Sequence, residues 1–188
     1  MNLTGVIIAG GKSKRMGKNK LLLTFQNQTL LDKAVYLLEN FTSKIIISTN
    51  NDTLQTSYTV LRDSIQNIGP LAGIYQALNN ATTPRIIIIP VDMPLLNKQI
   101  LQFLLNKSEE YAQINIFKTT QHIQMLVGIY HKSLLPVIEK QIEKKLYKLR
   151  DLLPVSSVNY IDGTQFEDKF INVNTPLEWQ NLINKYER

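Results

Sequence analysis

Residues Val6 to Leu23 read VIIAGGKSKRMGKNKLLL, and the rest of the chain is best understood from this segment. An apolar run passes directly into two glycines, a basic loop with a further glycine follows, and a second apolar run closes the segment. The first run is too short to span a membrane and has the length of a buried strand. The pattern therefore predicts a strand that ends in a glycine-rich, positively charged loop.

The two glycines are suited to binding phosphate. Gly10 and Gly11 lack a Cβ atom, so their backbone can take positive φ and their N–H groups can approach a ligand closely. Successive N–H groups in such a loop form a concavity that binds anions. Arg can grip phosphate oxygens with two hydrogen bonds, whereas Lys acts as a point charge. The basic side chains here are Lys12, Lys14, Arg15, Lys18 and Lys20. A solvated basic turn after an edge strand would have a similar composition, so both interpretations stand at this point.

Two common phosphate-binding motifs do not match the loop. The P-loop motif has about four residues between its glycines, but five residues separate Gly11 from Gly17, and Asn19 stands where that motif has Ser or Thr. The dinucleotide-binding pattern G-x-G-x-x-G is also absent. The segment is therefore interpreted as a phosphate loop of another kind.

Length and composition indicate one globular domain spanning residues 1–188. The chain is 44% hydrophobic and 19% charged, which is usual for a soluble protein. It has no cysteine, which excludes disulfides, thiolate metal sites and cysteine nucleophiles, and is compatible with a reducing cytoplasm. Neither a signal peptide nor a transmembrane helix is expected. We therefore expect a cytoplasmic protein without a membrane partner.

The formal net charge of +6 indicates a polyanionic ligand. The basic residues concentrate in the first loop and in the segment 132–150. Aromatic residues do not interleave with either cluster, as a base-stacking surface for nucleic acid would require. A small phosphorylated ligand is therefore favoured over nucleic acid. The segment 132–150 either meets an anionic substrate or, as such runs more often do, forms a solvated helix face.

The order of apolar segments predicts a doubly wound α/β fold, with a mostly parallel central sheet, helices on both faces and a less regular C-terminal half. Arg85 to Ile89 is expected to be a strand buried on both faces, because four isoleucines follow one another there. Other strands are expected in the first apolar run and at 44–50, 59–61, 114–118, 125–130, 156–161 and 169–173. The strands at 114–118 and 125–130 can pair antiparallel around a polar turn. Helices are expected at 29–40, 69–80, 97–106, 134–153 and 175–186.

Asp92 is the acidic residue with the strongest case for a catalytic role. It follows the isoleucine strand and lies between Pro90 and Pro94. Ligands of open α/β sheets bind outside the carboxyl ends of the strands. A carboxylate there suits Mg²⁺, which prefers oxygen ligands and shares them with phosphates. The alternative is that Asp92 caps the following helix. His122 and His131 have no metal-ligating partners at useful spacing and are interpreted as structural.

The motif Ala9-Gly10-Gly11-x-Ser13-x-Arg15-Met16-Gly17-x-x-Lys20 resembles the signature loop of the molybdenum cofactor guanylyltransferases. In this family the loop wraps a nucleoside triphosphate. Asn19 departs from the family pattern, which has Asp before the lysine, whereas Lys20 matches it. The resemblance covers nearly the whole chain. It implies a Rossmann-like nucleotidyltransferase fold, GTP and molybdopterin as substrates, and Mg²⁺ as cofactor.

The resemblance also implies a nucleotide-binding set. Asp63 precedes the turn Gly69–Gly73 and would recognise guanine, since a carboxylate can accept two N–H donors. Asn50 is half of a family pair of asparagines, and Ser48 stands in the place of the other half. The residues expected to bind the nucleotide are Ile8, Ala9, Gly10, Gly11, Lys20, Asn50 and Asp63.

The catalytic roles implied by the resemblance fall to Arg15, Lys20 and Asp92, with Asp92 also the metal ligand. Asn172 and Asn174 resemble a late Asn-x-Asn element that lies by the pterin side of the cleft. Turn chemistry and a helix cap before Thr175-Pro176 would account for these asparagines equally well. Trp179, Leu182 and Ile183 recur at helical spacing and are expected to be core residues.

The implied reaction is attack of a molybdopterin phosphate on the α-phosphorus of GTP, with release of pyrophosphate. Positioning and charge neutralisation would supply the catalysis. Transient contact with proteins that deliver or accept the cofactor is a further expectation. Alternatives remain open: a relative that uses CTP or another phosphorylated acceptor, such as the cytidylyltransferases for molybdopterin or methylerythritol phosphate, or a non-catalytic module that binds phosphate or nucleic acid.

Overall fold

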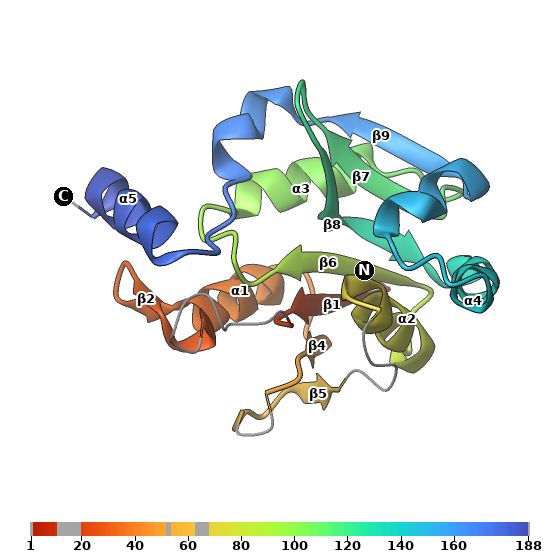
Figure 1. Ribbon diagram of the computed structural model, residues 1–188, viewed down its shortest axis with the longest axis horizontal. Helices are drawn as coiled ribbons and strands as arrows, with labels where there is room; N and C mark the ends of the chain where they lie inside the picture. Colours follow the sequence, from red (N-terminus) through yellow and green to blue (C-terminus); the bar gives the residue numbers. More distant parts are fainter. Residues whose placement is uncertain (1, 11–19, 52–53, 63–67, 188) are drawn as a thin grey trace.

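One mixed β-sheet forms the centre of the computed structural model, which describes residues 2–10, 20–51, 54–62 and 68–187 (Figure 1). The strand order is β5-β4-β1-β6-β8-β7-β9. Four of its six pairings are parallel, and β8 runs antiparallel to both of its neighbours. The strands are β1 (Leu3–Ile8), β4 (Ile45–Ser48), β5 (Thr59–Leu61), β6 (Arg85–Pro90), β7 (Ile114–Lys118), β8 (Ile123–His131) and β9 (Val158–Asp162). A separate antiparallel ribbon is formed by β2 (Thr24–Phe25) and β3 (Gln28–Thr29).

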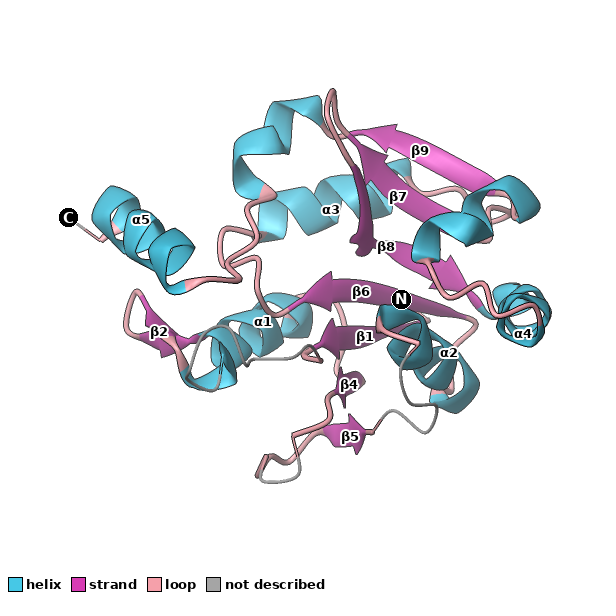
Figure 2. Cartoon of the chain, viewed as in Figure 1, coloured by secondary structure: helices cyan, strands magenta, loops and turns pink. Residues whose placement is uncertain are grey.

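Helices cover both faces of the sheet (Figures 1 and 2). One buried cluster contains Ile7 together with side chains of α1, α3 and α5, and the other contains Val6 with side chains of α2 and α4. Neighbouring residues of a strand point to opposite faces, so they enter different clusters. The α-helices are α1 (Leu30–Glu39), α2 (Pro70–Asn80), α3 (Lys98–Lys107), α4 (Leu135–Glu143) and α5 (Pro176–Tyr186). The 3-10 helices are η2 (Lys20–Leu22), η3 (Lys132–Leu134), η4 (Leu149–Val155) and η5 (Thr164–Lys169).

The isoleucine strand β6 is buried on both faces, as predicted. Ile88 is 0% exposed and Ile89 is 1% exposed. On one side Ile88 pairs with Val6 of the parallel strand β1, and on the other side it pairs with Gly128 of the antiparallel strand β8. The consecutive parallel pairings that start at β5 therefore end at β6, and beyond β8 the strands β7 and β9 pair in parallel again.

Two predicted elements are wrong. A continuous helix over 134–153 does not form, because α4 ends at Glu143 and Lys145 takes a left-handed φ of 59°, which terminates a helix. The predicted strand at 169–173 is replaced by the end of η5 and an irregular segment that pairs with no strand in the described ranges. The first strand begins at Leu3, three residues before the apolar run at Val6. The other predicted helices and strands agree with the structure to within about two residues, and 114–118 pairs antiparallel with 125–130.

Strands β1, β4 and β6 end at one edge of the sheet, called the carboxyl edge below. Ala9 N donates to Ser48 O at 2.8 Å, and Val91 N donates to Ile8 O at 3.1 Å. The loops that follow these strands therefore begin side by side. None of the described helices has the length and hydropathy that a membrane span requires.

Candidate active site

Three side chains from distant parts of the chain meet at the carboxyl edge. Lys20 Nζ donates to Asp92 Oδ2 at 3.1 Å and to Asn174 Oδ1 at 2.8 Å. The side chains of Lys20 and Asp92 are 14% and 22% exposed, respectively. The ion pair therefore lies in a partly buried rim, where salt screens it less than it screens an exposed pair.

Strand β6 brings Asp92 to this rim. The main-chain pairing with β1 extends one residue past the strand, through Val91 N, and the Val91 side chain is buried. The carbonyl of Asp92 accepts a hydrogen bond from Val173 N at 2.9 Å. The alternative role of Asp92 as a helix cap is wrong, because α3 is capped by Asn97, whose Oδ1 accepts from Ile100 N at 3.1 Å.

The short helix η2 brings Lys20 to the same rim. Its turn is closed by a hydrogen bond from Leu23 N to Lys20 O at 3.3 Å. Leu21, the next residue, is 3% exposed and belongs to the core cluster beneath α1. Burial of Leu21 therefore anchors the backbone while the neighbouring lysine side chain reaches Asp92.

The segment before α5 supplies Asn174. Glu178 Oε2 accepts hydrogen bonds from Asn174 N at 2.7 Å and from Thr175 N at 2.9 Å. Thr175 Oγ1 accepts in return from Glu178 N at 3.2 Å, which completes a capping box. The pKa of the Glu178 carboxyl lies below its ordinary value, chiefly because the carboxylate accepts the Asn174 N–H.

Helix α5 is anchored beside the β2–β3 ribbon (Figure 1). The rings of Trp179 and Phe25 pack edge to face, with centroids 6.3 Å apart. Leu182 is buried, and Trp179 and Ile183 pack partly buried against the same core cluster, which confirms their prediction as core residues. This anchoring fixes the start of α5 at the carboxyl edge.

The backbone at Gly10 borders open space. Gly10 is exposed, and a Cβ atom added there would meet no heavy atom within 4 Å. Gly69 has a φ of 61°, whereas Gly10 does not belong to the positive-φ glycines of the described ranges. Gly10 therefore does not use the positive φ that glycine allows, while room for the close approach of a ligand is present.

The remaining residues that were predicted to bind substrate differ in their burial, and some lie outside the described residues. Ile8 is buried at the end of β1, and Ala9 follows it half-buried. Asn50 is exposed just beyond β4, at the same edge. Asn172 is exposed. In the described part of the chain, the asparagine that contacts Lys20 is Asn174. Gly11, Arg15 and Asp63 lie outside the described residues.

Glycine at position 73 lets α2 pack directly on this edge. A Cβ atom on Gly73 would lie 2.5 Å from Ser48 Oγ and 3.2 Å from Ile8 Cδ1. Pro70 occupies the first turn of α2, where its missing N–H costs no hydrogen bond. The predicted helix-opening role of the Gly69–Gly73 turn is confirmed, with close packing as a further reason for its second glycine.

The donor set at Asp92 fits Mg²⁺ under one condition. In the residues that the structure describes, no three acidic or histidine side chains gather to hold a metal by themselves. Mg²⁺ usually keeps several waters and is bound by one or two carboxylates together with substrate phosphates. Asp92 Oδ2 already contacts Lys20 Nζ, and its carboxylate has some exposure on the rim. The residues present therefore fit a Mg²⁺ ion shared with phosphate, and not one held by protein alone.

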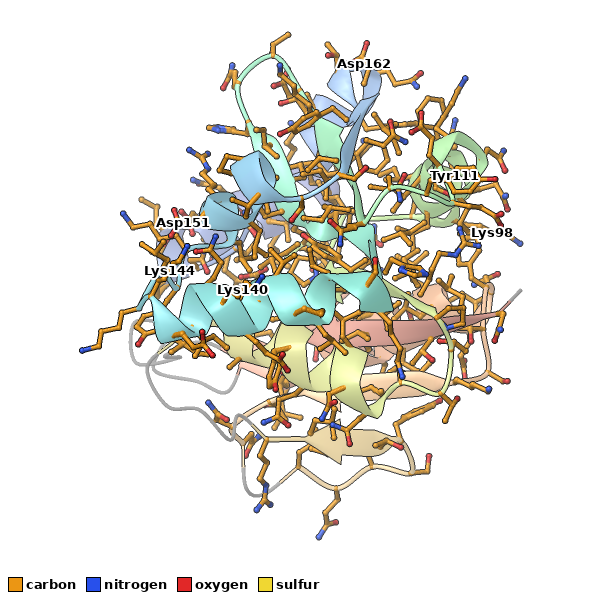
Figure 3. The ribbon with its side chains drawn as sticks, turned by 90° about the vertical axis from the view of Figure 1, so that its right-hand side faces the viewer. Lys98, Tyr111, Lys140, Lys144, Asp151 and Asp162 are labelled. Atoms are coloured by element: carbon orange, nitrogen blue, oxygen red, sulfur yellow. The ribbon has the colours of Figure 1, made fainter. Side chains whose placement is uncertain are left out.

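The basic segment 132–150 lies away from Asp92. Lys132 N donates to Pro84 O at 2.8 Å, just before the start of β6, whereas Asp92 follows its end. Figure 1 accordingly shows α4 beside the tail of the β6 arrow. Lys140 on α4 and Lys144 directly after it are exposed, on the side that faces the viewer in Figure 3. The segment therefore agrees with a solvated helix face, and not with a surface that meets the anionic substrate.

The two histidines have local structural roles. His131 Nδ1 accepts a hydrogen bond from Ser133 N at 3.1 Å and caps η3. The carbonyl of His122 accepts from Thr119 N at 2.8 Å in the turn between β7 and β8. These contacts agree with the structural interpretation of both residues.

Sequence analysis missed Glu178 and the packing role of Gly73. The spacing Thr175-x-x-Glu178 is a capping-box pattern and could have singled out the glutamate. The contact of Gly73 with Ser48 had no such local signal, because it joins a helix to a strand that is distant in sequence.

The chain matches a family model described as the MobA-like NTP transferase domain over residues 5–158. A Carboxydothermus hydrogenoformans protein named "Probable molybdenum cofactor guanylyltransferase" is 35% identical over 189 residues, covering 97% of this chain and 95% of the relative. A Flavobacterium johnsoniae protein of the same name is 33% identical, with 96% of each chain covered. The matched region contains the first loop, Lys20 and Asp92 and ends before Asn174.

The fold is also similar to a solved structure. Molybdopterin-guanine dinucleotide biosynthesis protein A from Archaeoglobus fulgidus superposes with a TM-score of 0.80 at 19% identity, covering 95% of each chain. This likeness concerns the fold, and it confirms the expected Rossmann-like nucleotidyltransferase architecture. Together with the family match and the relatives above 30% identity, it leads to one conclusion: this chain belongs to the MobA-like NTP transferase family.

Proposed function

We propose that this protein transfers GMP from GTP to the phosphate of molybdopterin and releases pyrophosphate. The observation that carries the proposal is the contact of Lys20 Nζ with both Asp92 and Asn174 at the carboxyl edge. A cation and a carboxylate side by side at the ends of parallel strands suit a metal-bound triphosphate. Relatives that share about a third of their residues with this chain carry the name of that activity.

The triphosphate would lie against the first loop. Main-chain N–H groups of Gly10 and Gly11 would donate to its oxygens, and Arg15 and Lys20 would supply positive charge. The end of β1, at Ile8 and Ala9, would form the floor of this site. The open space beside Gly10 supports this arrangement.

The guanosine part would be recognised by two further residues. Asp63 would accept N–H donors of guanine, which cytosine does not reproduce. Asn50, exposed beyond β4, lies at the same edge and would contact the nucleotide. Asp63 would therefore be the residue that discriminates against CTP.

Asp92 would hold Mg²⁺ together with the phosphates, and the ion would offset the negative charge that develops at phosphorus. Lys20 would neutralise further charge on the triphosphate. No side chain needs to form a covalent bond, since orientation and charge stabilisation can supply the rate enhancement. Asn172 and Asn174 would contact the pterin substrate on the other side of the cleft.

The wider setting of the enzyme is part of the same proposal. Residues 1–188 would act as one domain in the cytoplasm, with which the absence of cysteine is compatible. Proteins that deliver or accept the cofactor would make transient contacts with it. A basic ligand-binding rim is consistent with the formal net charge of +6.

The test is a pyrophosphate-release assay with GTP, Mg²⁺ and molybdopterin. We expect release that depends on all three, and a rate at least about tenfold lower when CTP replaces GTP, because Asp63 would lose its donors. Equal rates with CTP would favour the cytidylyltransferase alternative. Absence of release with every nucleoside triphosphate would favour a non-catalytic phosphate-binding module.

A further inference from the structure

We propose that Glu178 is a positioning residue of the active site, which holds the main chain of Asn174 so that the Asn174 side chain keeps Lys20 in its working position. The inference rests on the proposed function, in which Lys20 binds the triphosphate. It extends that function to a residue outside the rim, on the first turn of α5.

A continuous series of contacts links Glu178 to Asp92. Glu178 Oε2 accepts from Asn174 N at 2.7 Å, and Asn174 Oδ1 accepts from Lys20 Nζ at 2.8 Å. Lys20 Nζ reaches Asp92 Oδ2 at 3.1 Å. Asp92 O in turn accepts from Val173 N, next to Asn174, so the series closes on itself. A shift of residue 174 would therefore disturb both partners of the lysine.

One of these bonds is not explained by helix capping. A capping box needs the bond from the glutamate to the N–H of the cap residue itself, which here is Thr175. The bond to Asn174 N concerns the residue before the cap, and it is the shorter of the two, at 2.7 Å against 2.9 Å. Its direct effect is to restrain the residue whose side chain holds Lys20.

A lysine benefits from such restraint because its side chain is long and flexible, and it loses rotamer freedom when it binds a phosphate. Two oxygen acceptors on fixed backbone limit that freedom before substrate arrives. Preorganisation of this kind strengthens substrate binding by reducing its entropic cost.

Two conservative variants separate position from charge. Both bonds go to the same oxygen of Glu178, so the single amide oxygen of Glu178→Gln can accept them without the charge. Glu178→Asp keeps the charge but is one methylene shorter and cannot reach Asn174 N from the same backbone. We expect Glu178→Asp to raise the KM and the Kd for GTP about five- to tenfold, and Glu178→Gln to stay within about twofold of wild type.

Thr175→Ala is the matched control for helix capping. It removes the other half of the capping box and leaves the acceptor of Asn174 N in place. We expect it to lower the melting temperature while the Kd for GTP stays within about twofold of wild type. In an Asn174→Ala background, Glu178→Asp should have no further effect on the Kd. The fluorescence of Trp179, the one tryptophan of the chain, checks that α5 remains docked in each variant.

Four results would contradict a positioning role of Glu178. If Glu178→Gln weakens GTP binding and Glu178→Asp does not, charge and not position is responsible, and the inference is overturned. Equal weakening by both variants would also overturn it, because a correctly placed neutral acceptor would then not be sufficient. Equal weakening by Thr175→Ala would reduce the role of Glu178 to helix capping. If the wild type binds GTP and releases pyrophosphate, and Glu178→Asp has the same Kd and KM for GTP as the wild type, the inference alone is overturned. If the wild type neither binds GTP nor releases pyrophosphate, the proposed function is overturned as well.

Discussion

At the residue scale, Asp92 and Lys20 depend on one another. The lysine ammonium has an acidic partner and an amide partner, and the carboxylate has the lysine on Oδ2. In the proposed reaction the same carboxylate holds Mg²⁺. Removal of Asp92 would therefore remove a metal ligand and a partner of Lys20 at once, whereas the first loop would keep its remaining charge.

Asp92→Ala should lower the rate of pyrophosphate release by at least about 100-fold, because charge developing at phosphorus would no longer be offset by a metal ion held in place. GTP should still bind, more weakly, through the first loop. The rate is measured with saturating GTP, and binding is measured by calorimetry.

Asp151→Ala is the control for Asp92→Ala. Asp151 lies on η4, at the end of the sheet opposite the carboxyl edge. Figure 3 labels it near Lys144. This variant should keep the wild-type rate. Full activity of Asp92→Ala would contradict the assignment of Asp92 to the metal.

At the element scale, the carboxyl edge depends on how closely α2 packs on β4. The nearest atom to a Cβ atom at position 73 would be Ser48 Oγ, at 2.5 Å, which is too close for a real contact. Ser48 Cβ would be 3.4 Å away, at ordinary van der Waals distance. The cost of a larger residue at 73 should therefore come chiefly from one hydroxyl group.

Gly73→Ala should lower the free energy of unfolding by about 1–2 kcal/mol, because overpacking outweighs the better helix propensity of alanine. In a Ser48→Ala background the same change should be neutral or stabilising by up to about 1 kcal/mol. The 2.5 Å contact is then gone, the remaining 3.2 Å contact is with the end of the Ile8 side chain, and the helix propensity remains. Urea unfolding of the four proteins gives the coupling energy. Equal effects of Gly73→Ala in both backgrounds would contradict this packing argument.

At the scale of the whole molecule, the two halves of the chain share one core. Ile161 and Phe170, from the less regular half, lie in the same buried cluster as Ile7 of β1. The other cluster likewise joins Val6 to Ile138 of α4. Elements that share a core in this way unfold together.

Calorimetry of the protein should show a single unfolding transition. GTP with Mg²⁺ at about 100 times its Kd should move that whole transition up by roughly 5–10 °C, since ligand that binds only the folded state adds about 2.7 kcal/mol. Chelation of Mg²⁺ should reduce the shift. Two separate transitions would contradict the proposal of one domain spanning residues 1–188.

Much of the fold was predictable because its signals are local. The isoleucine run of β6 and the Thr175-Pro176 start of α5 depend on neighbours within a few residues, so patterns of hydropathy and helix capping predicted them. The helix predicted over 134–153 was wrong because a left-handed residue at Lys145 interrupts a favourable helical pattern. The strand predicted at 169–173 has suitable residues but no strand beside it in the described ranges.

Residue types and their order along the chain were sufficient to predict an α/β protein and to propose a phosphate-binding loop, because strand periodicity, glycine pairs and a carboxylate after a buried strand are features of short segments. They were sufficient also to name Asp92 and Lys20 as separate candidates. The contact between these two, and the bond that ties Glu178 to Asn174, depended on folding. Lys20 lies 72 residues from one partner and 154 from the other, and side chains so far apart in sequence meet only when the pairing order of the strands and the docking of α5 bring their backbones together.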